Sequence, residues 1–219
     1  MSLKQVMSAL AVSSVLSLPA LASDYLDTST SFSDENKQTK TRVIFVPEGT
    51  AVELPEWSGS DVNAVSRAAE IEEFKGEASQ LTTVIAPEGT KANHLLLAGV
   101  GNPAELSRFE AEKLGASIAA ALKPELENVV FDTRLISNPG IAAELSSHIA
   151  HGIDLRNYRF DRYQSEPKER PQTAYHWLVK SPDMAEKKYL ASRAIAEGVF
   201  VARDITALPG SDGYPEAIV

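Results

Sequence analysis

Residues 182–209 read PDMAEKKYLASRAIAEGVFVARDITALP and form the longest helical pattern in the chain. One set of apolar side chains recurs at spacings of four and three residues, as on one face of a helix: Ala191, Ile195, Val199, Ala202 and Ile205. Charged side chains recur on another face, which we expect to meet solvent: Glu186, Arg193, Glu197 and Asp204. Ser181 is a good cap for the start, and Pro209 disfavours helical geometry at Leu208. We therefore expect one long helix that buries the first of these faces.

The segment after this helix begins with dense turn chemistry and ends in an apolar run. Residues 210–215 are rich in Gly, Ser, Asp and Pro, and residues 216–219 read EAIV. This ending is typical of a chain whose next domain is missing, so we expect 210–219 to be the start of a C-terminal domain. A frayed end on a complete small protein is the alternative that the sequence leaves open.

The composition is that of a soluble globular protein with room for a core. The chain has 219 residues, of which 43% are hydrophobic and 23% charged, and this length suits one domain or one and a half. It contains no cysteine, which excludes disulfides, thiolate metal sites and a cysteine nucleophile. The formal net charge of −9 shows no basic footprint, so nucleic acid is an unlikely partner.

The first 40 residues are predicted to lie outside the folded domain. Residues 1–22 resemble an export signal, with Lys4 before an apolar run at 6–18 and an A-x-A cleavage site at 20–22. This pattern predicts a periplasmic or secreted protein. An organelle transit peptide and an uncleaved amphipathic N-terminus are the alternatives. Residues 23–40 are polar and are expected to form a disordered arm.

Strand-like and helix-like segments alternate through the rest of the chain. Buried strands are expected at 41–46, 81–86, 94–100, 128–132 and 175–180. Helices are expected at 61–74, 102–122, 138–152 and 182–209. This alternation predicts an α/β layered fold in which helices flank a parallel or mixed central sheet. We assign residues 41–180 to one domain and residues 181–209 to a helix that leads out of it.

Helix starts are predicted from capping residues. Asp61 is expected to cap the helix over 61–74, and Asn138 with Pro139 the helix over 138–152. Asn102, with Pro103 in the first turn, is expected to start the helix over 102–122. The buried stripe of that last helix is predicted to be Leu106, Phe109, Leu114, Ile118 and Leu122.

The search for catalytic patterns yields no assigned catalytic, cofactor-binding or metal-binding residue. The Gly99–Val100–Gly101 stretch lies at a strand end, where a phosphate-binding turn would lie, but the third glycine and the downstream acid of a dinucleotide motif are missing. A tight turn explains it better. No G-x-S-x-G nucleophile elbow occurs.

Histidines and aromatic residues give weak signals only. His148 and His151 share a helix face and could touch one metal ion, but no further ligands stand out, so capping or surface roles are favoured. His94 and His176 lie in predicted strands and are interpreted as structural. Residues 158–163 interleave aromatics with arginines, which suits an anion or nucleic acid; an edge in which arginine pairs with Asp161 is the favoured interpretation.

Four stretches together resemble the N-terminal domain of the M17 leucyl aminopeptidases, also called cytosol aminopeptidases. The first pair is Phe74–Lys75–Gly76 with Leu95 to Gly101, and the helix that includes Leu114–Gly115–Ala116. The more specific pair is YRFDRY at 158–163 and EGVFVARDI at 197–205, followed by Pro209. Ala207 and Ser211 replace asparagines that the family has around this proline.

The resemblance implies a macro-domain-like fold for 41–180, with 181–209 as an interdomain helix. It also implies that two divalent metals, Zn or Mn, belong to a following catalytic domain, whose V-G-K-G-x-x-x-D-S-G-G and N-T-D-A-E-G-R motifs are absent here. The whole protein would be a hexameric metalloaminopeptidase acting on peptides, and this chain would be an inactive part that serves assembly and access control. The family is usually cytoplasmic, unlike the export signal predicted here.

Two other functions are kept as alternatives. A stand-alone macro-like module would bind a nucleotide-like ligand at the strand ends, near the turn at 99–102. DNA contact through residues 156–162 is the weaker alternative, and the acidic balance opposes it.

Overall fold

A six-stranded sheet forms the centre of the computed structural model, which describes residues 28–85, 87, 91–122, 128–166 and 172–209. The strands are β1 (Thr28–Ser33), β2 (Thr41–Pro47), β3 (Leu81–Ile85), β4 (His94–Gly101), β5 (Asn128–Asp132) and β6 (Thr173–Leu178). Their order across the sheet is β1-β6-β5-β2-β4-β3. All neighbours are parallel except β3, which runs antiparallel to β4. The predicted mixed sheet is therefore confirmed.

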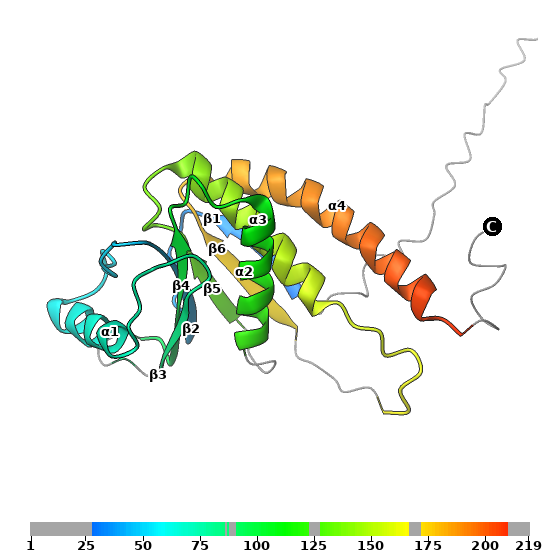
Figure 1. The fold of residues 1–219 in the computed structure, drawn as a ribbon, viewed down its shortest axis with the longest axis horizontal. Coiled ribbons are helices and arrows are strands. Elements are labelled where there is room, and N and C mark those ends of the chain that lie inside the picture. Colours follow the sequence, from blue (N-terminus) through cyan, green and yellow to red (C-terminus); the bar gives the residue numbers. More distant parts are fainter. Residues whose placement is uncertain (1–27, 86, 88–90, 123–127, 167–171, 210–219) are drawn as a thin grey trace, which may run out of the picture.

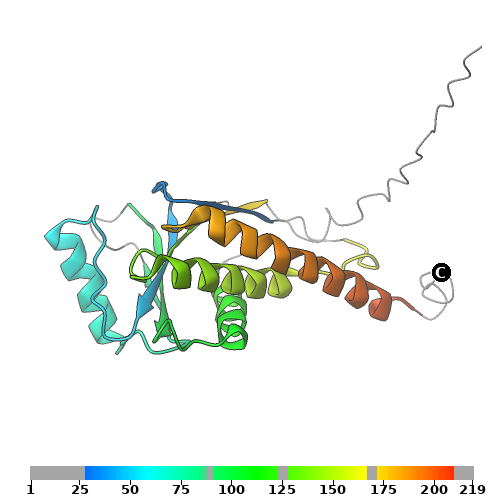
Figure 2. The same cartoon turned by 90° about the horizontal axis from the view of Figure 1, so that it is seen from above.

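The helices cover the two faces of this sheet unequally (Figures 1 and 2). They are α1 (Gly59–Ile71), α2 (Arg108–Ala121), α3 (Pro139–Asn157) and α4 (Pro182–Ala207). The larger core lies between the sheet and α2, α3 and the first turns of α4, around stacked Phe131 and Trp177. The smaller core lies under α1 and contains side chains of β2, β4 and β3, but none of β1, β5 or β6. Helix α1 therefore covers only that half of the sheet face which β2, β4 and β3 form.

The predicted disordered arm is wrong for residues 28–33. These residues form β1, an edge strand that pairs in parallel with β6 along its whole length. The sequence TSTSFS has few large apolar side chains, which is why it read as an arm. Phe32 packs on Trp177 and Tyr189, so a single aromatic anchors the strand to the core. The predicted signal peptide at 1–22 lies outside the described residues, as do 23–27 and 210–219.

Two helices begin at other caps than those predicted. Helix α1 has Ser58 as its N-cap, and Asp61 instead accepts a hydrogen bond of 2.8 Å from the Ser58 N–H. Helix α2 begins at Arg108 after Ser107, whose side chain and that of Glu110 form a capping box. Asn102 only closes a turn, in which its side chain bonds Glu105 and the Ala104 N–H. The capping box of α2 therefore begins at Ser107, five residues after the predicted cap Asn102. Both residues are followed by a glutamate three positions later, which makes the two sites similar in sequence. Phe109 of the predicted stripe is exposed on α2, and Ile71 is exposed at the end of α1.

The long helix α4 forms as predicted, but it buries a third face, which is neither the predicted apolar face nor the charged one. Its buried side chains are Ala185, Tyr189, Ser192, Ala196 and Phe200. Ile195 of the predicted face is 51% exposed, and Ala191 and Ala202 are exposed too. Small side chains at Ser192 and Ala196 let α4 lie close to α3, whereas the apolar period favours the larger Ile195. The far end of α4 extends past the end of α3 (Figures 1 and 2).

No helix in the described part of the chain is both long and apolar enough to span a membrane.

Candidate functional site

The candidate site is the contact between α3 and α4, here called the α3–α4 clamp. It comprises Asp154, Leu155 and Tyr158 on the α3 side, and Tyr189, Arg193, Phe200, Arg203 and Asp204 on α4. These residues belong to segments that are about 40 positions apart in the sequence, so only the fold brings them together.

Tyr158 is the centre of the outer half of the clamp. Its ring stacks on Phe200 with the ring centroids 5.3 Å apart, and its hydroxyl donates a 2.6 Å hydrogen bond to Asp204. The guanidinium of Arg203 covers the same ring at 5.3 Å and donates to the Leu155 carbonyl at 2.8 Å. Tyr158 follows the end of α3, so these contacts tie the last turns of α4 to the domain.

Asp154 is the centre of the inner half. Its side chain is buried, the Tyr189 hydroxyl donates to its Oδ2 at 2.9 Å, and Arg193 lies 3.8 Å away. Its Oδ1 has no hydrogen-bond partner among the described residues. Burial raises the pKa of Asp154 to about 6, against the opposing effects of Arg193 and Tyr189. Burial and Asp154 also raise the pKa of Tyr189 to about 12, so this tyrosine stays a neutral donor.

Asp154→Asn is expected to stabilise the chain above pH 6. The folded state binds the Asp154 proton more tightly than the unfolded state, so this group stabilises below its ordinary pKa of 3.8 and the contribution is lost as the pH rises to about 6. The loss is on the order of 2–3 kcal/mol. Urea unfolding from pH 4 to 8 should show wild type and variant converging at low pH. A constant difference across this range would contradict the assignment.

Tyr158→Phe is expected to loosen the end of α4 without unfolding the domain. The variant keeps the stacked ring but loses the hydrogen bond to Asp204, worth about 1 kcal/mol. Amide hydrogen exchange should speed up over residues 196–207 and stay unchanged in the sheet. Tyr163→Phe is the matched control, because Tyr163 is 51% exposed. Equal exchange in both variants would show that the Tyr158 hydroxyl does not hold α4.

Gly99, Val100 and Gly101 are the last residues of β4, and backbone of a neighbouring segment packs against the two glycines. A Cβ at Gly99 would lie 2.1 Å from the Glu77 carbonyl oxygen. Gly101 has φ +58°, and its N–H donates to the Gly76 carbonyl. The tight-turn interpretation is therefore wrong for these residues: they end β4, and their missing side chains let the backbone of residues 76–80 lie against the strand.

The two helix histidines lie near glutamates of different helices. His148 lies 3.7 Å from Glu144 of its own helix, and His151 lies 3.9 Å from Glu112 of α2. Burial lowers the pKa of both histidines. Among the described residues, no three His, Asp or Glu side chains are grouped to hold a metal ion. The favoured surface or capping role is wrong for His151, which is 3% exposed and lies in the interior of α3.

The arginine-rich stretch at 158–163 contains the expected ion pair. Arg159 lies 3.2 Å from Asp161, and the rings of Phe160 and Tyr163 pack with their centroids 5.7 Å apart. His176 is structural as predicted: it lies in β6 with Ser31 at 3.1 Å from Nδ1 and Ser33 at 3.3 Å from Nε2.

Two features escaped the sequence reading. Asp154 gave no signal beyond its spacing of four from Tyr158, because an acid in a helix usually marks a solvent-facing side. The second feature is a buried ion network in which Asp132 lies 2.7 Å from both Arg42 and Arg134, and Glu56 contacts both arginines. In the sequence, this ion network was indicated only by the D-x-R spacing of Asp132 and Arg134 at the end of a strand.

Comparisons with known proteins agree on one family. The sequence profile described as "Cytosol aminopeptidase family, N-terminal domain" matches residues 39–167. A probable cytosol aminopeptidase of Rhodopseudomonas palustris (strain BisA53) is 33% identical over 160 residues, which cover 72% of this chain and 32% of that protein. One from Nitrobacter winogradskyi is 33% identical over 162 residues, with the same coverage. The match thus spans about a third of the length of these relatives.

Solved structures show the same fold. A mutant of tomato leucine aminopeptidase superposes with a TM-score of 0.67 at 21% identity, covering 87% of this chain and 40% of that one. The bottromycin maturation enzyme BotP superposes with a TM-score of 0.58 at 22% identity, covering 82% and 35%. The profile match extends over more than half of the chain and includes the first residues of the α3–α4 clamp. This chain therefore belongs to the cytosol aminopeptidase (M17) family and corresponds to its N-terminal domain.

Proposed function

We propose that this chain is the non-catalytic N-terminal part of an M17-type metalloaminopeptidase and serves its assembly and access control. The observation that carries the proposal is the α3–α4 clamp. It joins the two stretches that most resemble the family, 158–163 and 197–205, through the Tyr158 contacts with Phe200 and Asp204. A domain tied in this way to a projecting helix moves with it as one body, which suits a part that positions another domain.

The remaining parts of the enzyme follow from the family and belong to the same proposal. A catalytic domain joined after α4 would carry two divalent metals, Zn or Mn, and would remove N-terminal amino acids from peptides. The assembled protein would be a hexamer, and the N-terminal signal would direct it to the periplasm or outside the cell.

The test starts from the protein as its source makes it. An antibody against residues 41–180 should detect a product well above 23.6 kDa that hydrolyses leucine p-nitroanilide. The 219-residue chain alone should show no hydrolysis with Zn²⁺ or Mn²⁺. Hydrolysis by the short chain would refute the non-catalytic role, and a native product of only this size would refute the larger enzyme.

A second variant tests the assembly role. Phe200→Ala in the long product should weaken the clamp and shift the protein to smaller assemblies in light scattering. Val201→Ala is the matched control, because Val201 is 43% exposed on the same helix. Unchanged assembly after Phe200→Ala would separate the clamp from oligomer formation.

A further inference from the structure

A cavity lies on the sheet face opposite α3 and α4, and the path of the chain creates it. Strand β1 ends at Ser33 and β2 begins at Thr41, and these parallel strands are separated in the sheet by β6 and β5. Residues 34–40, here called the strap, must cross that face, because β2 starts at the same edge of the sheet as β1. The strap contains no helix, and α1 does not reach this half of the face. Parallel sheets are ordinarily covered on both faces, so this half is incompletely filled.

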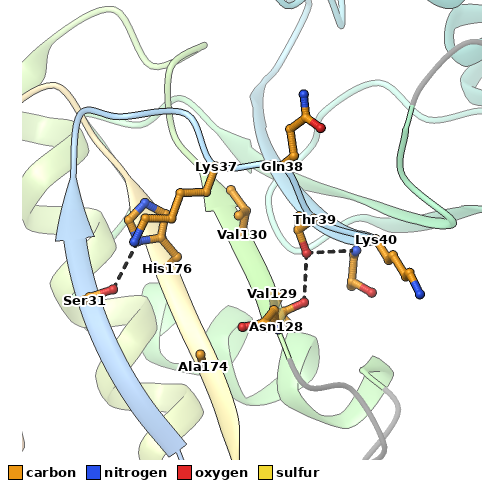
Figure 3. Close-up of a pocket in the computed structure, with 11 residues that line it drawn as sticks. Ser31, Lys37, Gln38, Thr39, Lys40, Asn128, Val129, Val130, Ala174 and His176 are labelled. Atoms are coloured by element: carbon orange, nitrogen blue, oxygen red, sulfur yellow. Dashed lines mark hydrogen bonds between the residues drawn. The ribbon is translucent and has the colours of Figure 1, made fainter.

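The cavity lies between the strap and the strands beneath it (Figure 3). Its volume is about 520 Å³, within the range of about 300–1,000 Å³ that is typical of small-molecule sites. The strands contribute Ser31, Asn128, Val129, Val130, Ala174 and His176. The strap and the start of β2 contribute Lys37, Gln38, Thr39, Lys40 and Thr41.

The strap is held in place, so the cavity has fixed walls. The His176 ring lies 3.3 Å from the Glu35 carbonyl, the Arg42 guanidinium donates to the Lys37 carbonyl at 3.1 Å, and the Thr39 hydroxyl donates to the Asn128 carbonyl at 3.0 Å. These contacts tie the strap to β6, β2 and β5 in turn.

The charge of the cavity is opposite to that of the whole chain. Lys37 and Lys40 line it, and none of its described lining residues is acidic, although the chain has a formal net charge of −9. In the part of the chain that the structure describes, neither lysine has an ion-pair partner. Lys37 extends over the His176 ring, and Lys40 lies towards the other end (Figure 3). Burial lowers the pKa of His176, and the positive charges of Lys37 and Arg42 lower it further. The ring is therefore neutral at pH 7 and does not repel a cation.

The floor of the cavity is formed by one face of the sheet. The Thr41 side chain does not belong to that face, because Thr41 pairs with Val129 of the larger core, whereas Arg42 pairs with Val130 beneath the strap. Apolar wall is supplied by Val130 and Ala174. The cavity therefore offers an ammonium group and a small apolar surface.

We propose that this strap cavity binds a small organic anion, whose phosphate or carboxylate pairs with Lys37 while its body lies against Val130 and Ala174. Lys40 supplies a second cation at the other end of the site. The proposal does not depend on the proposed function, because the cavity and the α3–α4 clamp lie on opposite faces of the sheet.

Calorimetry with charge-matched pairs of probes tests the proposal on the full chain at low salt. AMP is compared with adenosine, and benzoate with benzamide, so that each pair differs mainly in its anionic group. We expect AMP or benzoate to bind with a Kd of about 1 mM or below, and its neutral partner to bind at least about tenfold more weakly. Binding by AMP alone identifies a phosphate ligand, and binding by benzoate alone a carboxylate. Equal binding within both pairs, or no heat from either anion at about 5 mM, would overturn the proposal.

Two variants place the binding in this cavity. Lys37→Gln should weaken the anion about tenfold, whereas Lys187→Gln, which removes the same charge from exposed α4, should change Kd less than twofold. Ala174→Leu should abolish binding by filling the cavity, provided that its urea midpoint stays near that of the wild type. Should Ala174→Leu not fold, Lys37→Gln decides alone. An unchanged Kd in Lys37→Gln rejects the site even if the anion binds elsewhere on the chain.

Discussion

Gly152→Ala is expected to destabilise the chain by about 3 kcal/mol or more, because it forces α2 and α3 apart. An added Cβ at Gly152 would lie 2.0 Å from the Glu112 carbonyl oxygen, and one at Gly115 would lie 2.1 Å from the Ile149 carbonyl oxygen. Both obstacles are backbone atoms of the facing helix, which cannot turn away as a flexible side chain would. The two helices cross at these glycines, and the largest core is built against that crossing.

Gly198→Ala separates this steric effect from the helix preference of alanine. Gly198 lies in α4 with no atom within 4 Å of its added Cβ. The change should therefore stabilise by about 0.5–1 kcal/mol, since alanine favours the helix over glycine. Urea unfolding of both variants measures the contrast. A similar stability change in both would show that α2 and α3 can move apart at little cost.

Asp132→Ala is expected to destabilise by about 3–5 kcal/mol, because it leaves buried positive charge without its counter-ion. Asp132 is completely buried, and each of its neighbours Arg42 and Arg134 approaches its Oδ2 at 2.7 Å. Its Oδ1 also accepts from the backbone N–H of Arg134 at 3.1 Å. Arg42 is itself buried, so water does not replace the lost carboxylate.

An exposed ion pair and a double variant serve as controls. Asp161→Ala removes the pair with Arg159 at the surface and should cost less than about 1 kcal/mol. Asp132→Leu with Arg42→Met replaces the charges by apolar groups, and it should recover much of the stability that Asp132→Leu loses alone. Urea unfolding of these variants measures the coupling. If the double variant is no more stable than Asp132→Leu, the loss comes from packing and not from the unpaired charge.

The strands were the most predictable part of this fold. Val43 to Val46, Leu95 to Val100 and Val129 to Phe131 are continuous apolar runs, and each became a strand buried on both faces. A run of this kind needs cover from two layers, so its position and its place in the core follow from local sequence. Strand β1 was missed because its only large apolar side chain is Phe32, and its pairing with β6 is a contact between distant segments.

Sequence reasoning fared worse for the faces of the helices and for the sites. The apolar period in α4 favoured Ile195, but the structure buries Ser192 and Ala196, because close approach to α3 requires small side chains there. The clamp pairs Tyr158 with Asp204, and the strap cavity brings Lys37 together with Val130 and His176. Spacing along one segment carries no information about such partners.

Apart from β1, the sequence by itself determined the kinds of element, their order along the chain and the family, because local apolar patterns and short motifs can be recognised within one segment. It also determined that YRFDRY and EGVFVARDI both resemble motifs of the family, but it did not show that the two stretches are in contact. Only the tertiary structure decided that Tyr158 holds α4 through Phe200 and Asp204, and that the strap leaves a cationic cavity over β5 and β6. These features arise when strands from both ends of the chain join one sheet, and the free energy that selects that arrangement comes from contacts between distant residues.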